Sequence, residues 1–311
     1  MKNEIIITGP MYPPTLAELE QTYQAHRLWT AADKPGLLAS VAERITAVAS
    51  SNSGGIDAAT IGKLPKLKVI SHFGVGYDTV DVNAARSRGV AVTNTPDVLT
   101  DEVADLAVGL LLATIRRIPQ GDRYVREGKW LKGAMALTES LQGKTVGIIG
   151  MGRIGRAIAR RVEAFGVKIA YQGPSQKRDV TWPYFADPEA LARDCDVVIA
   201  ACPGGEATRG LVSRAVIEAI GPKGFLVNIA RGSVVDEPAL IEALQQNRIA
   251  GAGLDVFVDE PRVPEAFMSM ENVVLQPHVA SATHPTRKAM GQLVIDNLAA
   301  HFAGKALLTP V

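Results

Sequence analysis

The sequence predicts an α/β protein with two Rossmann-like, doubly wound parallel-sheet domains and a deep interdomain cleft. Two observations predict this fold. Short apolar runs rich in β-branched residues alternate with segments of helical periodicity, as in parallel sheets covered by helices. One run, 145–149, leads directly into a Gly-x-Gly-x-x-Gly segment, Gly150–Gly155, and then into a helix, which is the order of elements in a dinucleotide-binding turn.

The first domain is expected to be discontinuous and to comprise residues 1–98 and 286–311. Its strands are predicted at 5–8, 45–49, 69–72 and 90–93, and its helices at 16–26, 35–44, 58–64 and 83–88. A final amphipathic helix, 286–302, follows the last strand of the second sheet and is therefore expected to return to the first domain. Because the glycine segment lies outside this domain, we expect the first domain to bind the substrate.

The second domain is expected to span residues 99–285 and to bind the dinucleotide. Thr100 has the character of a helix N-cap. The helix that begins there is expected to end before Pro119. Residues 120–142 form a polar stretch in which Trp130 is expected to be exposed. Beyond the glycine segment, strands are predicted at 167–171, 196–201, 224–230, 251–256 and 272–276, with helices at 213–220 and 237–246.

The composition indicates small-molecule chemistry. With 33 Lys plus Arg against 32 Asp plus Glu, the net charge of +1 gives no reason to expect nucleic acid or a charged membrane as a partner. Two cysteines are too few for a disulfide framework, the histidines have no metal-ligand spacing, and the longest apolar region, 106–113, is far too short to cross a bilayer. We therefore expect a cytoplasmic protein without a metal.

Each glycine of the segment Gly150–Gly155 has a physical reason. Gly150 permits the tight turn, Gly152 lets the backbone approach a pyrophosphate, and Gly155 lets helix and strand pack closely. The helix that follows directs unpaired N–H groups at the phosphates.

The end of the next strand predicts which dinucleotide binds. A site selective for NAD usually carries Asp or Glu about 20 residues beyond the first glycine, where it binds the ribose 2′-hydroxyl. Here the loop contains Ser175, Lys177 and Arg178, and no acid occurs before Asp179. These side chains could bind a 2′-phosphate through charge-assisted hydrogen bonds, although exposed Lys and Arg also occur as solvated surface charges. We expect NADP(H) to be preferred, with NAD(H) as the second choice.

Three polar residues follow predicted strands of the second domain: Arg231, Glu260 and His278. Because the carboxyl ends of parallel strands face the ligand crevice, the three could converge near a nicotinamide. Each also has an ordinary structural explanation. Arg231 could bind carbonyl groups, Glu260 could belong to a turn with Pro261, and His278 could be a satisfied loop histidine.

With these motifs the sequence resembles the D-isomer-specific 2-hydroxyacid dehydrogenase family, essentially from end to end. The segments that carry the resemblance are 73–78, 150–155, 229–237, 253–261 and 277–281. Within the family the sequence is most similar to the glyoxylate/hydroxypyruvate reductases, through segments 94–101 and 281–284. That branch commonly uses NADPH.

The resemblance implies a division of roles among the polar residues. His278 is the general acid that protonates the developing alkoxide, Glu260 is its partner, and Arg231 binds the substrate carboxylate while polarising the keto oxygen. The backbone N–H groups of Val75 and Gly76 bind the remaining carboxylate oxygens.

The resemblance further places Ser281 among the substrate-binding residues and implies that Asp255 binds the nicotinamide carboxamide. The expected cofactor-binding set is completed by Thr100, Met151, Arg153, Ile154, Cys202, Pro203, Thr208, Ile229, Ala230 and Ala280. We call residues 120–142 the arm. Trp130 implies a homodimer, because in similar reductases a tryptophan of this arm reaches the partner's active site; an ordinary interface tryptophan is the alternative.

The other histidines are not expected to act directly in catalysis. His72, in the strand before Val75, is expected to be packed or to act indirectly, with direct substrate contact as the alternative. His26 and His301 are expected on the surface.

We therefore expect an enzyme that uses NADPH to reduce small 2-keto acids, hydroxypyruvate and glyoxylate first, to D-2-hydroxy acids. One alternative is a dehydrogenase of the same family for a bulkier 2-keto acid. The other is a dinucleotide-sensing, corepressor-like binding protein.

Overall fold

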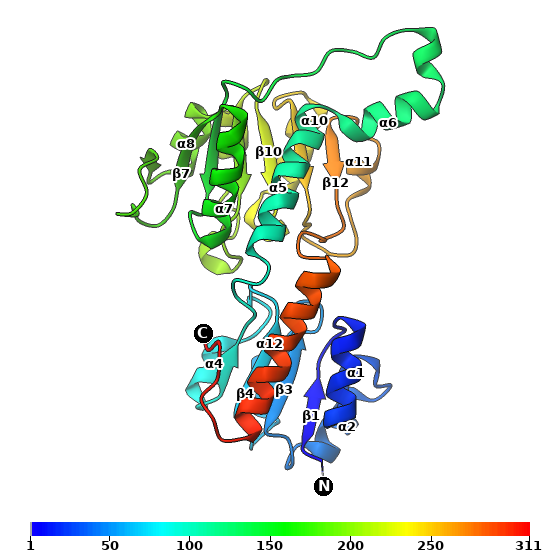
Figure 1. The fold of residues 1–311 in the computed structure, drawn as a ribbon, viewed down its shortest axis with the longest axis vertical. Helices are drawn as coiled ribbons and strands as arrows, with labels where there is room; N and C mark the ends of the chain where they lie inside the picture. Colours follow the sequence, from blue (N-terminus) through cyan, green and yellow to red (C-terminus); the bar gives the residue numbers. More distant parts are fainter. Residues whose placement is uncertain (1) are drawn as a thin grey trace. The chain divides into compact units, whose positions relative to one another are not determined.

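The computed structural model describes residues 2–311, which divide into two compact α/β units (Figure 1). Unit 1 consists of the residues up to Leu99 together with Ser281–Val311, and unit 2 of Thr100–Ala280. Each unit holds one sheet in which all neighbouring strands are parallel, so the predicted class of two parallel-sheet α/β domains is confirmed. Within the described residues, no helix is long and apolar enough to span a membrane.

The sheet of unit 1 has the strand order β2-β1-β3-β4-β5. Its strands are β1 (Glu4–Ile7), β2 (Gln24–Arg27), β3 (Ala47–Ser51), β4 (Val69–Phe73) and β5 (Ala91–Thr93). Strands β3 and β4 are buried along their whole length, as expected where helices cover both faces of a parallel sheet. The chain order reverses between β1 and β3, and ligands of such sheets bind at the carboxyl ends of the strands near that point.

Helices cover both faces of this sheet. One face packs against α2 (Lys34–Val41), α3 (Ala58–Gly62) and α4 (Val82–Ser87), and alternating strand residues such as Ile70 form its core. The other face packs against α12 (His284–Phe302), which lies beside α1 (Pro13–Thr22) (Figure 1). The two helices approach closely at Gly291, where an added Cβ would lie 1.8 Å from Oγ1 of Thr15.

Three predictions in unit 1 were wrong. The helix predicted at 16–26 ends at Thr22, and its last residues form the edge strand β2, which is too short and too polar to show alternation in the sequence. His26 is accordingly not a surface residue, because its Nε2 lies 2.9 Å from Oε2 of Glu4 and its side chain is only 16% exposed. His301 is also half-buried, with Nε2 3.1 Å from Oγ1 of Thr46, and burial lowers its pKa.

The sheet of unit 2 has the order β12-β11-β10-β9-β6-β7-β8. Its strands are β6 (Thr145–Ile149), β7 (Lys168–Gln172), β8 (Tyr184–Phe185), β9 (Val197–Ala200), β10 (Phe225–Asn228), β11 (Gly251–Leu254) and β12 (Val273–Leu275). The order reverses between β6 and β9, as in dinucleotide-binding sheets. The glycine segment follows β6, so it lies at this reversal.

Helices cover this sheet as well. Helices α5 (Thr100–Ile115) and α7 (Arg153–Val162) pack together on one face, while α8 (Pro188–Asp194), α9 (Arg214–Ile220) and α10 (Glu237–Gln245) enclose the main core on the other. The remaining helical segments are α6 (Ile118–Arg126), α11 (Glu265–Met268), and the short 3₁₀ turns η2 (Lys129–Lys132), η3 (Glu163–Phe165), η4 (Glu206–Thr208) and η5 (Gly232–Val234).

The prediction for Pro119 was incomplete. Helix α5 ends four residues earlier, at Ile115, and Pro119 lies in the first turn of α6, where its missing N–H has no helical partner to lose. Residues 120–142 are therefore not simply a polar connection, because their first part is helical.

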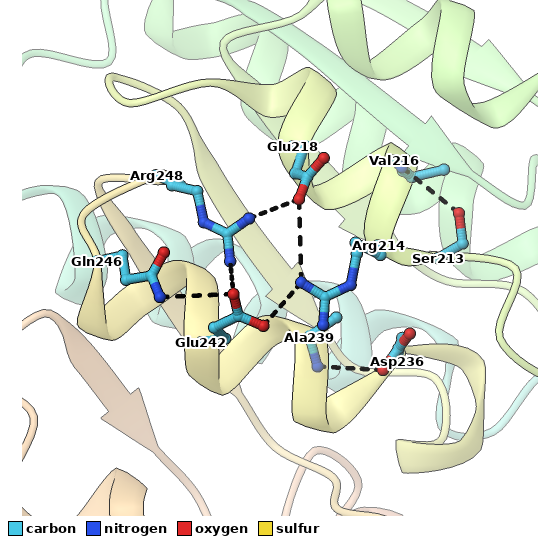
Figure 2. Close-up of polar contacts among 9 residues, drawn as sticks. All are labelled: Ser213, Arg214, Val216, Glu218, Asp236, Ala239, Glu242, Gln246 and Arg248. Carbon is cyan, nitrogen blue, oxygen red and sulfur yellow. Dashed lines mark hydrogen bonds and ion pairs between the residues drawn. The ribbon is translucent and has the colours of Figure 1, made fainter.

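Helices α9 and α10 are joined by a closed set of ion pairs (Figure 2). Arg248 lies 2.5 Å from Glu218 and 2.6 Å from Glu242, while Arg214 lies 2.8 Å from Glu242 and 3.9 Å from Glu218. The hydrogen bond from Arg214 lowers the pKa of Glu242. Since these side chains are 29–47% exposed, water screens the ion pairs, and each pair contributes little to stability.

Candidate active site

The glycine turn has the geometry that its motif predicts. Gly150 has φ 101°, and an added Cβ would lie 2.6 Å from the amide nitrogen of Cys202, in the loop after β9. An added Cβ at Gly155 would lie 2.0 Å from the carbonyl oxygen of Gly150, so only glycine lets α7 pack against the turn. Gly152 differs, because no heavy atom lies within 4 Å of its Cβ position.

The open position at Gly152 fits the pyrophosphate of a dinucleotide. Gly152 is the N-cap of α7 and provides no side-chain cap, so the N–H groups of the first turn are available to an anion. The turn also lies at the carboxyl end of β6, where the strand order reverses. Backbone space, helix dipole and topology therefore agree on a phosphate site.

The loop after β7 contains the residues expected to contact a 2′-phosphate. Ser175 and Arg178 are exposed, and the amide N–H of Lys177 donates to the hydroxyl of Tyr171 at 2.8 Å, which ties the loop to the strand. The side chain of Arg156, on α7, donates to both carboxylate oxygens of Asp179 at 2.7 and 3.0 Å.

This pairing changes the electrostatics of the loop. The hydrogen bond from Arg156 lowers the pKa of Asp179, so the acid is ionised but its charge is offset by the guanidinium. The sequence held no signal for this pair, because its members are 23 residues apart in different elements.

Arg231 lies just beyond the carboxyl end of β10. The side chain of Asn228 spans the turn: its Nδ2 donates to the carbonyl of Arg231 at 3.0 Å, and its Oδ1 accepts from the N–H of Ala230 at 3.0 Å. Nη1 of Arg231 donates to the carbonyl of Ala230 at 2.8 Å, so binding of a carbonyl is part of what this side chain does. Gly232 packs against the backbone of Phe257, where an added Cβ would lie 1.9 Å from the carbonyl carbon. This contact joins the Arg231 turn to the loop after β11.

Glu260 and His278 form a hydrogen-bonded pair. Nδ1 of His278 lies 2.6 Å from Oε2 of Glu260, while Oε1 of Glu260 accepts from the N–H of Phe257 at 3.0 Å. Burial raises the pKa of Glu260, but the hydrogen bond and charge of His278, the Phe257 N–H and the charge of Arg231 outweigh it, so that the pKa lies below its usual value. Glu260 is therefore an anion at neutral pH and is fixed by two hydrogen bonds.

A buried aspartate holds the His278 segment in place. Asp255 is fully buried, its Oδ1 and Oδ2 accept from the N–H groups of Val279 and Ala280 at 2.8 and 3.0 Å, and its carbonyl accepts from the N–H of His278 at 2.8 Å. His278 has φ 53°, a left-handed conformation that costs energy for a residue with a side chain. Burial raises the pKa of Asp255, and the two N–H donors oppose that rise. The carboxylate thus holds the strained backbone that aims the imidazole.

The other expected residues take several positions. Thr100 is the first residue of α5, and Oγ1 of Thr208 donates to the carbonyl of Pro203 at 2.7 Å, closing the loop after β9. Cys202 is buried, and burial raises its pKa to about 11, so its thiol is uncharged at neutral pH. Met151, Ile229, Ala230 and Ala280 are buried, Ile154 is half-buried, and Arg153 is exposed.

Four further residues lie away from the strand ends of unit 2. Val75 and Gly76 follow β4 in unit 1, and Ser281 begins the segment that returns to unit 1. Trp130 is 69% exposed in η2, as the sequence predicts.

A doubly wound sheet with an open glycine turn at its reversal point, and with an arginine and a histidine–carboxylate pair at the same edge, defines a dinucleotide-dependent oxidoreductase. The chain belongs to the D-isomer specific 2-hydroxyacid dehydrogenase family: residues 108–280 match the model of that family's NAD binding domain. The family expected from the sequence motifs is confirmed.

Known proteins resemble the chain over its whole length. A glyoxylate/hydroxypyruvate reductase A of Arabidopsis thaliana is 50% identical over 99% of this chain and 98% of its own, and a hydroxyphenylpyruvate reductase of Plectranthus scutellarioides is 50% identical over the same shares. Among solved structures, an NADPH-dependent glyoxylate/hydroxypyruvate reductase of Sinorhizobium meliloti, in complex with NADP and malonate, is 46% identical. It superposes with a TM-score of 0.94 and covers 100% of this chain and 97% of that one.

Proposed function

We propose that the protein uses NADPH to reduce small 2-keto acids, glyoxylate and hydroxypyruvate first, to D-2-hydroxy acids. The observation that carries the proposal is the His278–Glu260 pair, held by Asp255 at the carboxyl edge of a dinucleotide-binding sheet. Relatives named glyoxylate/hydroxypyruvate reductase, 46% and 50% identical over nearly the whole chain, support the same substrate class.

The proposed roles follow from the chemistry of the side chains. The nicotinamide, when bound, supplies the hydride that adds to the keto carbon. Nδ1 of His278 is engaged by Glu260, which leaves Nε2 to give a proton to the developing alkoxide. Arg231 presents a planar fork that matches a carboxylate and polarises the keto oxygen. The N–H groups of Val75 and Gly76 are proposed to bind the remaining carboxylate oxygens of the substrate.

A second candidate substrate class is favoured by one comparison. The hydroxyphenylpyruvate reductase of Plectranthus scutellarioides is as similar to this chain as the glyoxylate/hydroxypyruvate reductase, and its name indicates an aromatic 2-keto acid. A bulkier substrate is therefore the alternative within the same chemistry. The corepressor-like alternative would bind dinucleotide without turnover.

The proposed preference for NADP(H) rests on the loop after β7. Ser175, Lys177 and Arg178 can contact a 2′-phosphate, and Arg156 offsets the charge of the one acid that follows them. The Sinorhizobium meliloti relative was solved with NADP, which supports this reading. Titration with 2′,5′-ADP and with 5′-ADP tests it: we expect the 2′-phosphorylated nucleotide to bind more tightly, and equal affinities would overturn the preference.

We also propose that the protein is a homodimer joined through the arm that follows α5. Trp130, Leu131 and Leu137 expose 69%, 93% and 100% of their surface, which is unusual for large apolar side chains so close together in the chain. A second copy of the arm would cover them. Light scattering after size-exclusion chromatography should give twice the chain mass, and Trp130→Glu should give the monomer mass; a wild-type monomer would refute the proposal.

The function is tested by following NADPH oxidation with a panel of 2-keto acids that includes glyoxylate, hydroxypyruvate and hydroxyphenylpyruvate. We expect turnover with the first two and a drop of about 100-fold or more in kcat for His278→Gln, since a positioned general acid contributes roughly that factor. Higher kcat/KM with the aromatic acid would favour the alternative substrate. Absence of turnover with every 2-keto acid would refute the reductase.

A further inference from the structure

The loop that follows β4 is held by its carbonyl groups. The carbonyl of Gly74 accepts from the N–H of Thr95 at 3.0 Å, that of Val75 accepts from Nδ2 of Asn94 at 2.9 Å, and that of Gly76 accepts from Nε2 of His72 at 3.0 Å. Three successive carbonyls of unit 1 are thus bonded to the body of that unit.

This arrangement determines where the N–H groups point. In a trans peptide the N–H is antiparallel to the carbonyl of the preceding residue, so anchoring those three carbonyls turns the N–H groups of Val75, Gly76 and Tyr77 away from their anchors. Among residues 2–311, these three N–H groups have no acceptor. Successive unpaired N–H groups form a concave, partly positive surface that suits an anion.

His72 is the anchor of the Gly76 carbonyl. Its side chain is fully buried in β4, and Nδ1 lies 2.9 Å from Oγ of Ser50, in the neighbouring strand β3. Nε2 faces both the carbonyl of Gly76 and Oδ1 of Asn52, the latter at 2.9 Å. Since a carbonyl can only accept, Nε2 carries the proton and donates it toward the loop.

The ring also determines the shape of the loop. An added Cβ at Gly74 would lie 2.9 Å from Nε2 of His72 and 3.1 Å from Oδ1 of Asn52, so the backbone turns directly over the imidazole. Asn94 is likewise buried, so both side chains reach the loop from beneath. Neither side chain has to touch a ligand in order to aim the N–H groups.

We propose that His72 and Asn94 are positioning residues for the substrate carboxylate: by anchoring the carbonyls of Gly76 and Val75, they aim three N–H groups, including that of Tyr77, at one anion. The proposal rests on the proposed function and adds to it a third N–H donor and two side chains. Because the loop binds the carboxylate and not the reacting carbon, loosening it should weaken substrate binding more than it slows the chemical step.

The main test is His72→Phe, which keeps a planar ring but removes both ring nitrogens. We expect KM for glyoxylate and Kd for oxamate, a non-reducible carboxylate of similar shape, to rise about tenfold, the effect of one hydrogen bond to a charged group. The kcat should change less than about threefold, and Kd for NADPH should not change. His72→Gln, whose amide can donate to the Gly76 carbonyl, should recover part of the affinity.

Ser71→Ala is the matched control. Ser71 precedes His72 in β4, is equally buried and bonds to Thr93, yet it does not contact the loop, so it reports the effect of removing a buried hydrogen bond alone. If Ser71→Ala and His72→Phe raise KM equally, the positioning role is refuted. Should His72→Phe fail to fold, Asn94→Ser tests the same loop through the carbonyl of Val75.

The outcomes separate this proposal from the reductase activity. Turnover by the wild type with an unchanged KM and oxamate affinity in folded His72→Phe and Asn94→Ser overturns the positioning role alone. If the wild type reduces no 2-keto acid, the reductase proposal fails, and oxamate binding by wild type and variants still decides the carboxylate site. A wild type that reduces no 2-keto acid and does not bind oxamate overturns both.

Discussion

Replacing Glu260 by glutamine removes the negative charge beside His278 while keeping the size of the side chain. The two side chains are 34% and 32% exposed and lie 2.6 Å apart, so the pair is screened by water on one side. A hydrogen bond between charged groups contributes ~1.5–3 kcal/mol, and partial exposure favours the lower end of that range. We therefore take the loss as about 1.5 kcal/mol, which corresponds to about one pH unit in a protonation equilibrium.

The sign follows from the proposed reaction. Reduction requires the protonated imidazole, and the carboxylate of Glu260 favours that form, so the variant should lose activity at lower pH than the wild type does. We expect the alkaline limb of the pH profile of kcat for glyoxylate reduction to move down by about one pH unit. The lowered pKa of Glu260 reflects the same attraction between the two side chains. This attraction stabilises the folded protein above the usual pKa of the carboxyl group, and the stabilisation is lost as the pH falls through the lowered pKa.

Glu237→Gln is the control for this experiment. Glu237 belongs to the same neighbourhood, with Oε2 accepting from the N–H of Val258 at 3.2 Å, but it does not contact His278. It should leave the alkaline limb where it is in the wild type. An unmoved limb in correctly folded Glu260→Gln would refute the idea that the carboxylate maintains the acid form of the catalytic group.

Three further predictions concern the backbone contacts of each unit. Gly155→Ala should lower the free energy of unfolding by ~1–3 kcal/mol, because its Cβ would lie 2.0 Å from a carbonyl oxygen. Gly152→Ala has open space around its Cβ, so thermal unfolding should give an unchanged Tm, while fluorescence titration should give a Kd for NADPH about tenfold or more higher. Asp255→Asn should lower kcat about tenfold or more with a smaller change in KM, because one amide oxygen cannot replace two carboxylate oxygens that hold the His278 segment. Gly291→Ala should destabilise the protein to denaturant by ~1–3 kcal/mol, because its Cβ would meet a threonine of α1 at 1.8 Å.

Each of these predictions has a contradicting result. Equal losses of Tm in the Gly152 and Gly155 variants would mean that the open position is not open in solution. A wild-type kcat in Asp255→Asn would show that the left-handed conformation of His278 does not depend on the carboxylate. Unchanged stability in Gly291→Ala would mean that α1 and α12 can separate at no cost.

Much of the fold and of the candidate site could be predicted from the sequence, because the relevant sequence signals are local. A strand, a glycine turn and a helix occupy one continuous segment, so the dinucleotide site around Gly150 could be recognised before any tertiary contact was known. Arg231, Glu260 and His278 were singled out because each follows a strand, and the carboxyl ends of parallel strands share one edge. Their catalytic roles stay predictions.

Elements whose local sequence does not indicate their structure could not be predicted. Strand β2 has only four residues and a polar sequence, so its place at the edge of the sheet depends on pairing with β1 and not on its own pattern. Helix α6 starts at a proline region that, taken alone, signals the end of a helix. In both cases tertiary contacts outweighed local preference.

The tertiary structure alone decided how the proposed catalytic and anion-binding groups are held. Asp255 clamps a segment 24 and 25 residues away, Arg156 offsets an acid 23 residues away, and Asn94 reaches a carbonyl 19 residues away. Such bonds join residues that are neighbours only after the strands have aligned, so no spacing in the sequence announces them. The sequence by itself determined which chemistry the chain carries, whereas the fold determined the directions of the N–H groups and of the imidazole on which that chemistry depends.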